Sequence, residues 1–184
     1  MAIPQKIIKY PRVAKGGDER MFIDLLEAAK IKYEPIKHRI VYTAFDKAAT
    51  LKVPQKMIGK TLVVKLDKPT LVLIPANKNL DKEKLKKVAK VKNVDFLKET
   101  WMKKNLKGVK VGAIPPFGNL WPLARRGQRP GGGLATFTDR SLINQPKIIV
   151  NGGDYNWSIK ISPTNFKKLI PDLIIGSFSK SRSR

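Results

Sequence analysis

The clearest pattern of hydrophobic and polar positions runs from Met57 to Ala76 and predicts two strands joined by a tight polar turn. Between Thr61 and Leu66 apolar residues alternate as they do along a strand with one apolar and one mixed face. Between Leu71 and Ala76 the chain is almost wholly apolar, which is typical of a strand covered on both faces. We therefore expect a β-hairpin here, with the rest of the chain organised around it.

Capping residues followed by apolar positions at helical spacing predict helices on both sides of this hairpin. The expected helices are 18–30 capped by Asp18, a short helix from the capping box of Thr43 toward Leu51, one that begins after Asp81, one over 95–106, and 162–170 opened by Ser162 and Pro163. Short strands are predicted at 33–37, 135–139, 147–151 and 157–161. These elements predict an α+β fold, with a sheet of several short strands and helices packed outside it.

A single folded domain is expected, because a chain of 184 residues can bury one proper core. Its predicted extent is 18–176. Residues 1–17 contain two prolines and a Gly-Gly pair and are interpreted as a basic arm over the surface. Residues 177–184 read SFSKSRSR, and this composition predicts a basic, disordered tail.

The net charge of the chain indicates which class of partner it binds. Lys and Arg number 38 against 14 Asp and Glu, which gives a formal net charge of +24 and a pI near 10.3. That exceeds what solubility requires and indicates a polyanionic partner, nucleic acid first. The alternative is a general lysine enrichment of the host proteome. No signal peptide or sufficiently long apolar run is evident, so we expect a cytoplasmic protein without membrane association.

Several kinds of catalytic site are excluded by the residue counts. The chain has no cysteine and one histidine, His38, which rules out thiolate metal sites, Cys nucleophiles and His/Cys metal clusters. It also lacks the GxSxG elbow and the glycine-rich motifs of phosphate- and dinucleotide-binding loops. We therefore expect no metal and no cofactor, and an enzyme here would work by positioning and backbone polarity. His38 is interpreted as structural, with acid/base use as the alternative.

Three stretches are candidates for a functional site. Lys60 and Thr61 stand where the chain enters the first hairpin strand, and a lysine there can hold its ammonium toward a phosphate or carboxylate; the alternative is a solvated lysine. The segment 111–118, VGAIPPFG, cannot be a helix, and Gly112 allows close approach to a rigid backbone; the alternative is a structural turn. Residues 119–133 are typical of a long, flexible, basic loop, and such loops are often functional.

The order of several sequence blocks resembles the YbaK and prolyl-tRNA synthetase-associated domain family, whose members remove wrong amino acids from tRNA. The resemblance runs from about Ile31 to Ile170. It rests on the blocks HRIVYTAFDKAATLKVP, MIGKTLVVKLD, LVLIPANKNLD, VGAIPPFG, TFTDRSL and IIVNGGDYNWSIKISP, in that order. It implies the family's fold, a mixed and strongly curved β-sheet of short strands surrounded by helices. The chain departs from many members in having Pro115 in place of serine and a basic, Gly-rich insertion around 125–133.

The resemblance also implies roles for individual residues. The family's key lysine falls on Lys60, and its Gly-x-x-x-Pro loop runs from Gly112 to Pro116, so these three residues are the expected catalytic ones. The expected substrate-binding residues are Thr61, Ile114, Pro115, Phe117, Gly118, Asn151, Gly152 and Gly153. The insertion residues expected to bind tRNA are Arg125, Arg126 and Arg129.

The substrate implied by the resemblance is an aminoacyl ester on the terminal ribose of a mischarged tRNA. Such an ester is already activated, so its hydrolysis needs mainly orientation and oxyanion stabilisation. Lys60 would contact the terminal phosphate or ribose, N–H groups near Gly112 would hold the carbonyl, and water or the neighbouring 2′-hydroxyl would attack. Two function classes stay open: a trans-acting deacylase, which we favour and for which an aminoacyl-tRNA synthetase is a candidate partner, and a noncatalytic RNA-binding relative.

Overall fold

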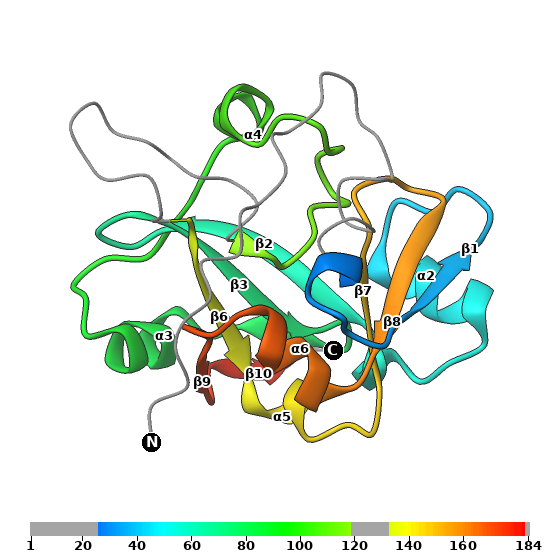
Figure 1. The fold of residues 1–184 in the computed structure, drawn as a ribbon. Helices are drawn as coiled ribbons and strands as arrows, with labels where there is room; N and C mark the ends of the chain where they lie inside the picture. The colour runs from blue at the N-terminus through cyan, green and yellow to red at the C-terminus, as the bar shows by residue number, and fades with distance from the viewer. Residues whose placement is uncertain (1–25, 119–132, 183–184) are drawn as a thin grey trace.

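The computed structural model describes residues 26–118 and 133–182, and the predicted hairpin lies at the centre of its largest sheet (Figure 1). In spatial order, the strands of this sheet are β5 (Asp95–Phe96), β2 (Gly59–Lys65), β3 (Pro69–Pro75), β6 (Ala135–Asp139) and β9 (Ile174–Gly176). β2 runs antiparallel to both β3 and β5, whereas β6 is parallel to β3 and β9 is parallel to β6. The sheet is therefore mixed.

Two smaller sheets hold the other strands of the described residues. One is antiparallel and contains β1 (Glu34–Lys37), β8 (Trp157–Ile161) and β7 (Ile148–Asn151); the other pairs β10 (Ser179–Ser181) with β4 (Lys78–Leu80). An isolated bridge between Ile58 and Ile149 connects the three-stranded sheet to the start of β2. The predicted α+β class is confirmed. The strands are divided among three sheets instead of one, and the bridge between the two larger sheets does not extend into a ladder.

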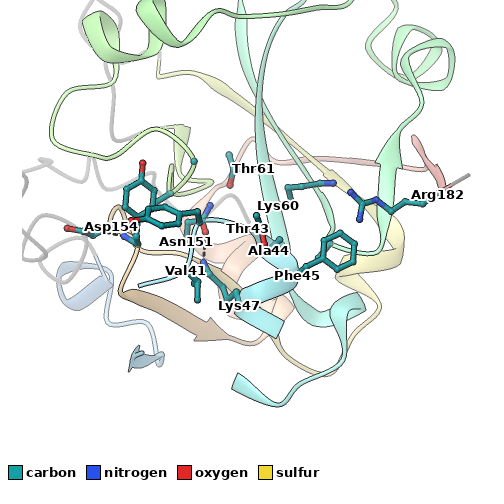
Figure 2. A pocket seen from close by; sticks show the side chains of 16 residues that line it. Val41, Thr43, Ala44, Phe45, Lys47, Lys60, Thr61, Asn151, Asp154 and Arg182 are labelled. Atoms are coloured by element: carbon teal, nitrogen blue, oxygen red, sulfur yellow. Dashed lines mark hydrogen bonds between the residues drawn. The ribbon is translucent and has the colours of Figure 1, made fainter. Parts of the chain in front are cut away.

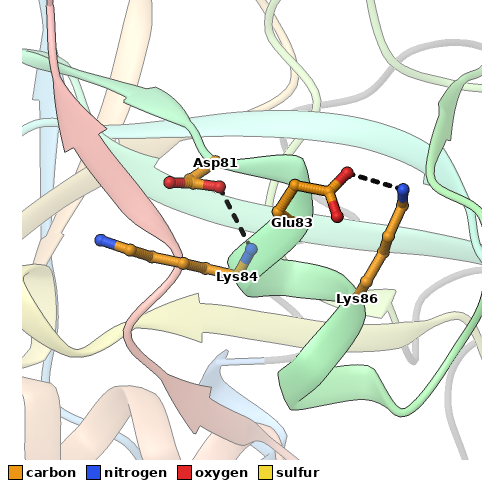
Figure 3. Close-up of polar contacts among 4 residues, drawn as sticks. All are labelled: Asp81, Glu83, Lys84 and Lys86. Carbon is orange, nitrogen blue, oxygen red and sulfur yellow. Dashed lines mark hydrogen bonds and ion pairs between the residues drawn. The ribbon is translucent and has the colours of Figure 1, made fainter.

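Helices surround the sheets, and three of their caps are the predicted ones. The described helices are α2 (Ala44–Leu51), α3 (Lys82–Ala89), α4 (Glu99–Asn105), α5 (Arg140–Ile143) and α6 (Pro163–Leu169), with a 3₁₀ turn at Gln55–Met57. Thr43, Asp81 and Ser162 each accept a hydrogen bond from a backbone N–H three residues later. Figure 3 shows the Asp81 cap of α3 and, beside it, the Lys86–Glu83 ion pair of 2.7 Å on the surface of this helix.

Two predicted helices differ from the structure or lie partly outside it. The helix predicted over 95–106 begins only at Glu99, because Asp95 and Phe96 pair with β2 instead. Of the helix predicted over 18–30, the structure describes residues from Leu26 onward, and Leu26 is helical and fully buried. The predicted arm, 1–17, lies outside the described residues. None of the helices in the described part of the chain combines the length and apolar character that crossing a membrane requires.

β3 is buried on both faces, as its apolar run predicted. Leu71 and Leu73 belong to a large apolar cluster that includes side chains of β7, β8 and α6. Val72 and Ile74 point to the opposite face and pack in a second cluster with Leu85 of α3. Because successive side chains of a strand point to opposite faces, this one strand joins the two parts of the core.

The C-terminal residues are part of the fold, so the predicted disorder of 177–184 is wrong for the described residues 177–182. Phe178 is fully buried in the second apolar cluster, and the backbone N–H groups of Phe178 and Ser179 each donate to Asp139 Oδ2 at 2.9 Å. β10 then pairs with β4, with Ser181 opposite Lys78. One buried aromatic ring and one buried carboxylate thus hold a segment whose composition predicts disorder.

Candidate functional site

A pocket of about 290 Å³ lies where the N-terminal end of α2 faces the start of β2 (Figure 2). Its walls come from the segment 41–47, the first residues of β2, the turn at 112–113, the end of β7 with the turn that follows, and Arg182 just beyond β10. These segments are far apart in the sequence; the junction of the two larger sheets brings most of them together, and the pairing of β10 with β4 adds Arg182. A cavity of this size is at the lower end of small-ligand sites, which span about 300–1,000 Å³.

Lys60 lies in β2 and lines the pocket. Its side chain is half-buried, and Nζ donates to the Lys78 carbonyl at 3.0 Å. Burial lowers the pKa of Lys60 below its ordinary value, and the positive charge of Arg182 lowers it further. The ammonium of Lys60 is therefore held by the main chain at the start of β2 while part of the side chain remains exposed. Thr61, the next residue, also lines the pocket, and its Oγ1 is buried without a hydrogen-bond partner among the described residues.

The turn at Gly112 forms another wall of the pocket. Gly112 has a φ of +89°, which glycine adopts readily and other residues do not. An added Cβ would lie 3.7 Å from the Tyr155 ring, so backbone conformation rather than crowding requires glycine here. Ala113 N–H is already donated to the Lys110 carbonyl at 2.9 Å, and the following prolines carry no N–H. Gly112 and Ala113 are the residues of this turn that line the pocket, which leaves the N–H of Gly112 as the candidate donor to a ligand.

A buried lysine that the sequence analysis missed lines the pocket from α2. Lys47 is 5% exposed, and its Nζ donates to Asn151 Oδ1 at 2.6 Å; Figure 2 shows this contact. Asn151 Nδ2 in turn donates to the Ile114 carbonyl at 3.2 Å. Burial lowers the pKa of Lys47 to about 8. The Lys47–Asn151–Ile114 chain of hydrogen bonds fastens α2, the end of β7 and the 111–118 loop to one another.

Aromatic side chains form one end of the pocket. Tyr42 and Tyr155 pack edge to face, with ring centroids 4.9 Å apart, and Tyr155 Oη donates to the Val111 carbonyl at 2.5 Å. Asp154 lines this end as well, and its carboxylate pairs with Lys110 at 2.8 Å. The turn before Gly112 is thus tied to the turn after β7 on the tyrosine side.

Four of the predicted site residues line the pocket: Lys60, Thr61, Gly112 and Asn151. Several of the others are packed behind it. Phe117 is fully buried against the Phe166 ring, and an added Cβ on Gly118 would lie 1.9 Å from the Leu134 carbonyl oxygen. An added Cβ on Gly152 would lie 2.6 Å from the Trp157 ring. The predicted residues of the loop and turn that do not line the pocket are Ile114, Pro115, Pro116, Phe117, Gly118, Gly152 and Gly153.

The remaining candidate residues either lie away from the pocket or are outside the residues that the structure describes. Arg125, Arg126 and Arg129 are outside the described residues. His38 does not line the pocket; its Nε2 lies 2.9 Å from Ser158 Oγ, and its Nδ1 lies 2.8 Å from the Arg39 carbonyl oxygen. Both contacts agree with a structural histidine.

Of the nine polar side chains that line the pocket among the described residues, the sequence predicted three as site residues, Lys60, Thr61 and Asn151, although one further signal was available. Ala44, Lys47, Ala48 and Leu51 stand at the i, i+3, i+4 and i+7 positions of α2, so a lysine occupies the apolar stripe of this helix. Tyr42, Asp154 and Tyr155 have no comparable local signal. Arg182 was assigned to a disordered tail, and its position depends on the pairing of β10 with β4.

The structure is therefore an α+β domain with a pocket whose described lining includes three cationic side chains, Lys47, Lys60 and Arg182. Within the described residues, no group of three or more His, Asp or Glu side chains could hold a metal ion. The pocket contains no serine and no histidine among its described lining residues, so the Ser–His arrangement of covalent hydrolases is not found there. Chemistry in this pocket would rest on lysine ammonium groups, hydroxyl groups and backbone N–H groups.

Comparison with known proteins identifies the family. The family model described as the aminoacyl-tRNA editing domain matches residues 38–169. The chain belongs to this family, of the YbaK type, as its sequence blocks predicted. None of the curated proteins matches the chain. Among solved structures, the hypothetical protein APE2540 is 21% identical with a TM-score of 0.73, over 89% of this chain and 100% of its own. A protein described as a candidate trans-editing enzyme for prolyl-tRNA synthetase is 18% identical with a TM-score of 0.70, over 89% of this chain and 97% of its own.

Proposed function

We propose that the protein is a trans-acting aminoacyl-tRNA deacylase that hydrolyses the ester of a mischarged tRNA. The observation that carries the proposal is that Lys60 and Gly112 line one pocket in a chain of an aminoacyl-tRNA editing family. The structural similarity to a candidate trans-editing enzyme for prolyl-tRNA synthetase supports the same activity, and a prolyl-tRNA synthetase is accordingly a candidate partner. A net charge of +24 suits a polyanionic substrate.

Gly112 would supply the oxyanion contact. Attack on the ester carbonyl places negative charge on its oxygen, and a preorganised N–H donor stabilises that charge more than it stabilises the ground state. The positive φ of Gly112 orients a peptide group at the pocket wall, and the Lys47–Asn151–Ile114 hydrogen bonds fix the loop that carries it. Pro115 and Pro116 would stiffen this loop without entering the pocket.

Lys60 would bind the terminal nucleotide. One of its N–H groups donates to the Lys78 carbonyl, which fixes the ammonium at the start of β2 while other N–H groups can reach a phosphate or ribose oxygen. The attacking group would be water, which releases the free amino acid, or the neighbouring 2′-hydroxyl of the tRNA, which would first take the acyl group as a new ester and leave its hydrolysis to a later water. Neither route forms a covalent bond to the protein, which is consistent with the absence of cysteine, serine and histidine from the described residues that line the pocket.

Release of free amino acid from a panel of mischarged tRNAs tests the proposal directly. The wild-type chain should deacylate at least one of them, and Lys60→Ala should not. Tight binding of tRNA without release of amino acid from any member of the panel would identify the noncatalytic RNA-binding alternative and reject the deacylase. A substrate that lacks the vicinal hydroxyl distinguishes the attackers, because loss of its hydrolysis indicates the 2′-hydroxyl and full hydrolysis indicates water.

A further inference from the structure

The pairing of the C-terminal strand β10 places Arg182 at the rim of the pocket. Arg182 follows β10 directly, lines the pocket, and lies with its guanidinium carbon 4.1 Å from the centroid of the Phe45 ring (Figure 2). Its Nε also donates to Asn79 Oδ1 at 3.4 Å. A guanidinium over an aromatic face is attracted by the ring, so Phe45 holds a planar cation at this position. Although exposed, Arg182 is therefore not a freely moving side chain.

The same register that places Arg182 also places Lys60. Ser181, the residue before Arg182, is the partner of Lys78 in the β10–β4 ladder. The carbonyl of Lys78 is the acceptor for Lys60 Nζ. One residue of β4 therefore connects both cations, and their proximity explains why Arg182 contributes to the lowered pKa of Lys60.

These two cations have no carboxylate to compensate them among the described residues of the pocket lining. Asp154 is the one acidic residue in that lining, and it is paired with Lys110 at the tyrosine end. Two like charges held side by side destabilise each other, and one anion bound to both would remove the repulsion. The arrangement suits an oxygen-rich anion, because a guanidinium and an ammonium together match the oxygens of a phosphate group.

We propose that Arg182 and Lys60 form a two-cation clamp for one backbone phosphodiester near the 3′ end of an RNA strand whose terminus enters the pocket. Phe45 sets the plane of the guanidinium in this clamp. The identification of the strand as RNA rests on the proposed function, whereas the clamp itself rests on the positions and charges of the two side chains. Residues 179–182 thus act as a fixed wall of the site rather than as part of a mobile tail that attracts tRNA.

Binding of a short, unacylated single-stranded RNA tests the clamp without requiring hydrolysis. Each of its last three phosphodiesters is replaced in turn by an uncharged methylphosphonate. Arg182→Gln should weaken binding of the natural RNA about tenfold, and it should have no further effect on the one RNA that lacks the clamped charge. Lys180→Gln is the matched control, because it removes the same charge from an exposed position on β10, two residues before Arg182. Arg182→Lys should bind with intermediate affinity, since it keeps the charge but not the planar contact with Phe45.

Three results would overturn the proposal. Equal losses from Arg182→Gln and Lys180→Gln would mean that only the overall charge matters. Losses from Arg182→Gln that persist with all three methylphosphonate RNAs would mean that Arg182 contacts no phosphodiester near the terminus. Displacement of the RNA by millimolar inorganic phosphate would mark a site for free phosphate. If the clamp behaves as expected while no mischarged tRNA is hydrolysed, the deacylase proposal fails and the clamp stands. If hydrolysis occurs, Arg182→Gln should raise KM and leave kcat unchanged.

Discussion

Replacing Lys47 by methionine tests how this buried ammonium is held. Lys47 is 5% exposed, and its hydrogen bond to Asn151 is the contact that fixes its Nζ. Burial lowers its pKa from an ordinary 10.5 to about 8. At about 1.4 kcal/mol per pH unit, keeping the ammonium charged in the folded protein costs about 3 kcal/mol relative to water. Methionine fills a similar volume and removes the charge, so it removes this cost.

The methionine also removes a hydrogen-bond donor. Asn151 Oδ1 would be left without it in a buried site, and an unpaired buried acceptor costs about 1–3 kcal/mol. The two effects oppose each other, so near pH 7 the free energy of unfolding of Lys47→Met should lie within about 1–2 kcal/mol of the wild type. This contrasts with the usual destabilisation caused by removing one member of a buried polar pair.

The pH dependence of the free energy of unfolding tests whether burial lowers the pKa of Lys47. Between pH 8 and 10.5 the unfolded chain keeps a proton on Lys47 that the folded protein has released, so the free energy of unfolding of the wild type rises with pH. Lys47→Met lacks this rise, and the difference between the two proteins should grow by about 3 kcal/mol across the interval. Urea unfolding at a series of pH values measures it, with Lys56→Met as a control that removes an exposed lysine. Parallel curves for wild type and Lys47→Met would refute the reasoning.

Three further predictions concern the proposed reaction. Lys60→Ala should abolish deacylation while the unfolding midpoint stays close to that of the wild type, because its Nζ makes one hydrogen bond, worth about 1 kcal/mol, to the main chain; unchanged turnover would exclude Lys60 from the site. Gly112→Ala should lower kcat about 10²-fold by displacing the N–H donor, whereas Gly108→Ala, at the same φ of +89° but outside the pocket lining, should cost similar stability and leave kcat unchanged. Mass spectrometry during turnover should detect no aminoacyl-protein adduct, and finding one would reject both proposed attackers.

The parts of the fold that the sequence predicted well are those determined by neighbouring residues. The hairpin around β2 and β3 and the caps of α2, α3 and α6 follow from alternation and from side chains that bond within three residues. The prediction of a helix over 95–106 was wrong for its first residues, because they pair with a strand that is distant in the sequence. Asp95 and Phe96 pair with β2 across some thirty residues, and no local pattern records that pairing.

The residues of the candidate site also fall into two groups, those predicted from a local motif and those placed by contacts with distant parts of the chain. Lys60 and Gly112 were found because they stand in motifs, each readable within its own few residues. Lys47 was missed because lysine is mostly exposed, and the partner that makes its burial tolerable is Asn151, 104 residues later. The pocket needs both kinds of residue: the motif supplies the groups proposed to meet the substrate, and the long-range hydrogen bonds hold them in place.

The order of the C-terminal segment depends on Asp139, and this dependence can be tested. Asp139 is 2% exposed and accepts from Ser141 Oγ and N and from the backbone N–H groups of Phe178 and Ser179. Burial would raise the pKa of this carboxyl, but the hydrogen bonds outweigh burial and hold the pKa below its ordinary value. The stability that this ionised group contributes is present above the unfolded-state pKa of 3.8 and is lost as the pH falls through the folded-state pKa.

Asp139→Asn keeps the shape of the side chain but turns an NH₂ group toward N–H donors. At about 1–3 kcal/mol for each buried group left unpaired, the free energy of unfolding should fall by about 2–4 kcal/mol, and the part of the acid dependence due to Asp139 should disappear. Hydrogen exchange gives the local result: the amides of Phe178 and Ser179 should lose protection, whereas those of β2 and β3 keep theirs up to the reduced global stability. Because β10 positions Arg182, the variant should also bind the short RNA as weakly as Arg182→Gln. Full protection of the two amides in Asp139→Asn would show that Phe178 and the pairing of β10 with β4 anchor the segment without the Asp139 carboxylate.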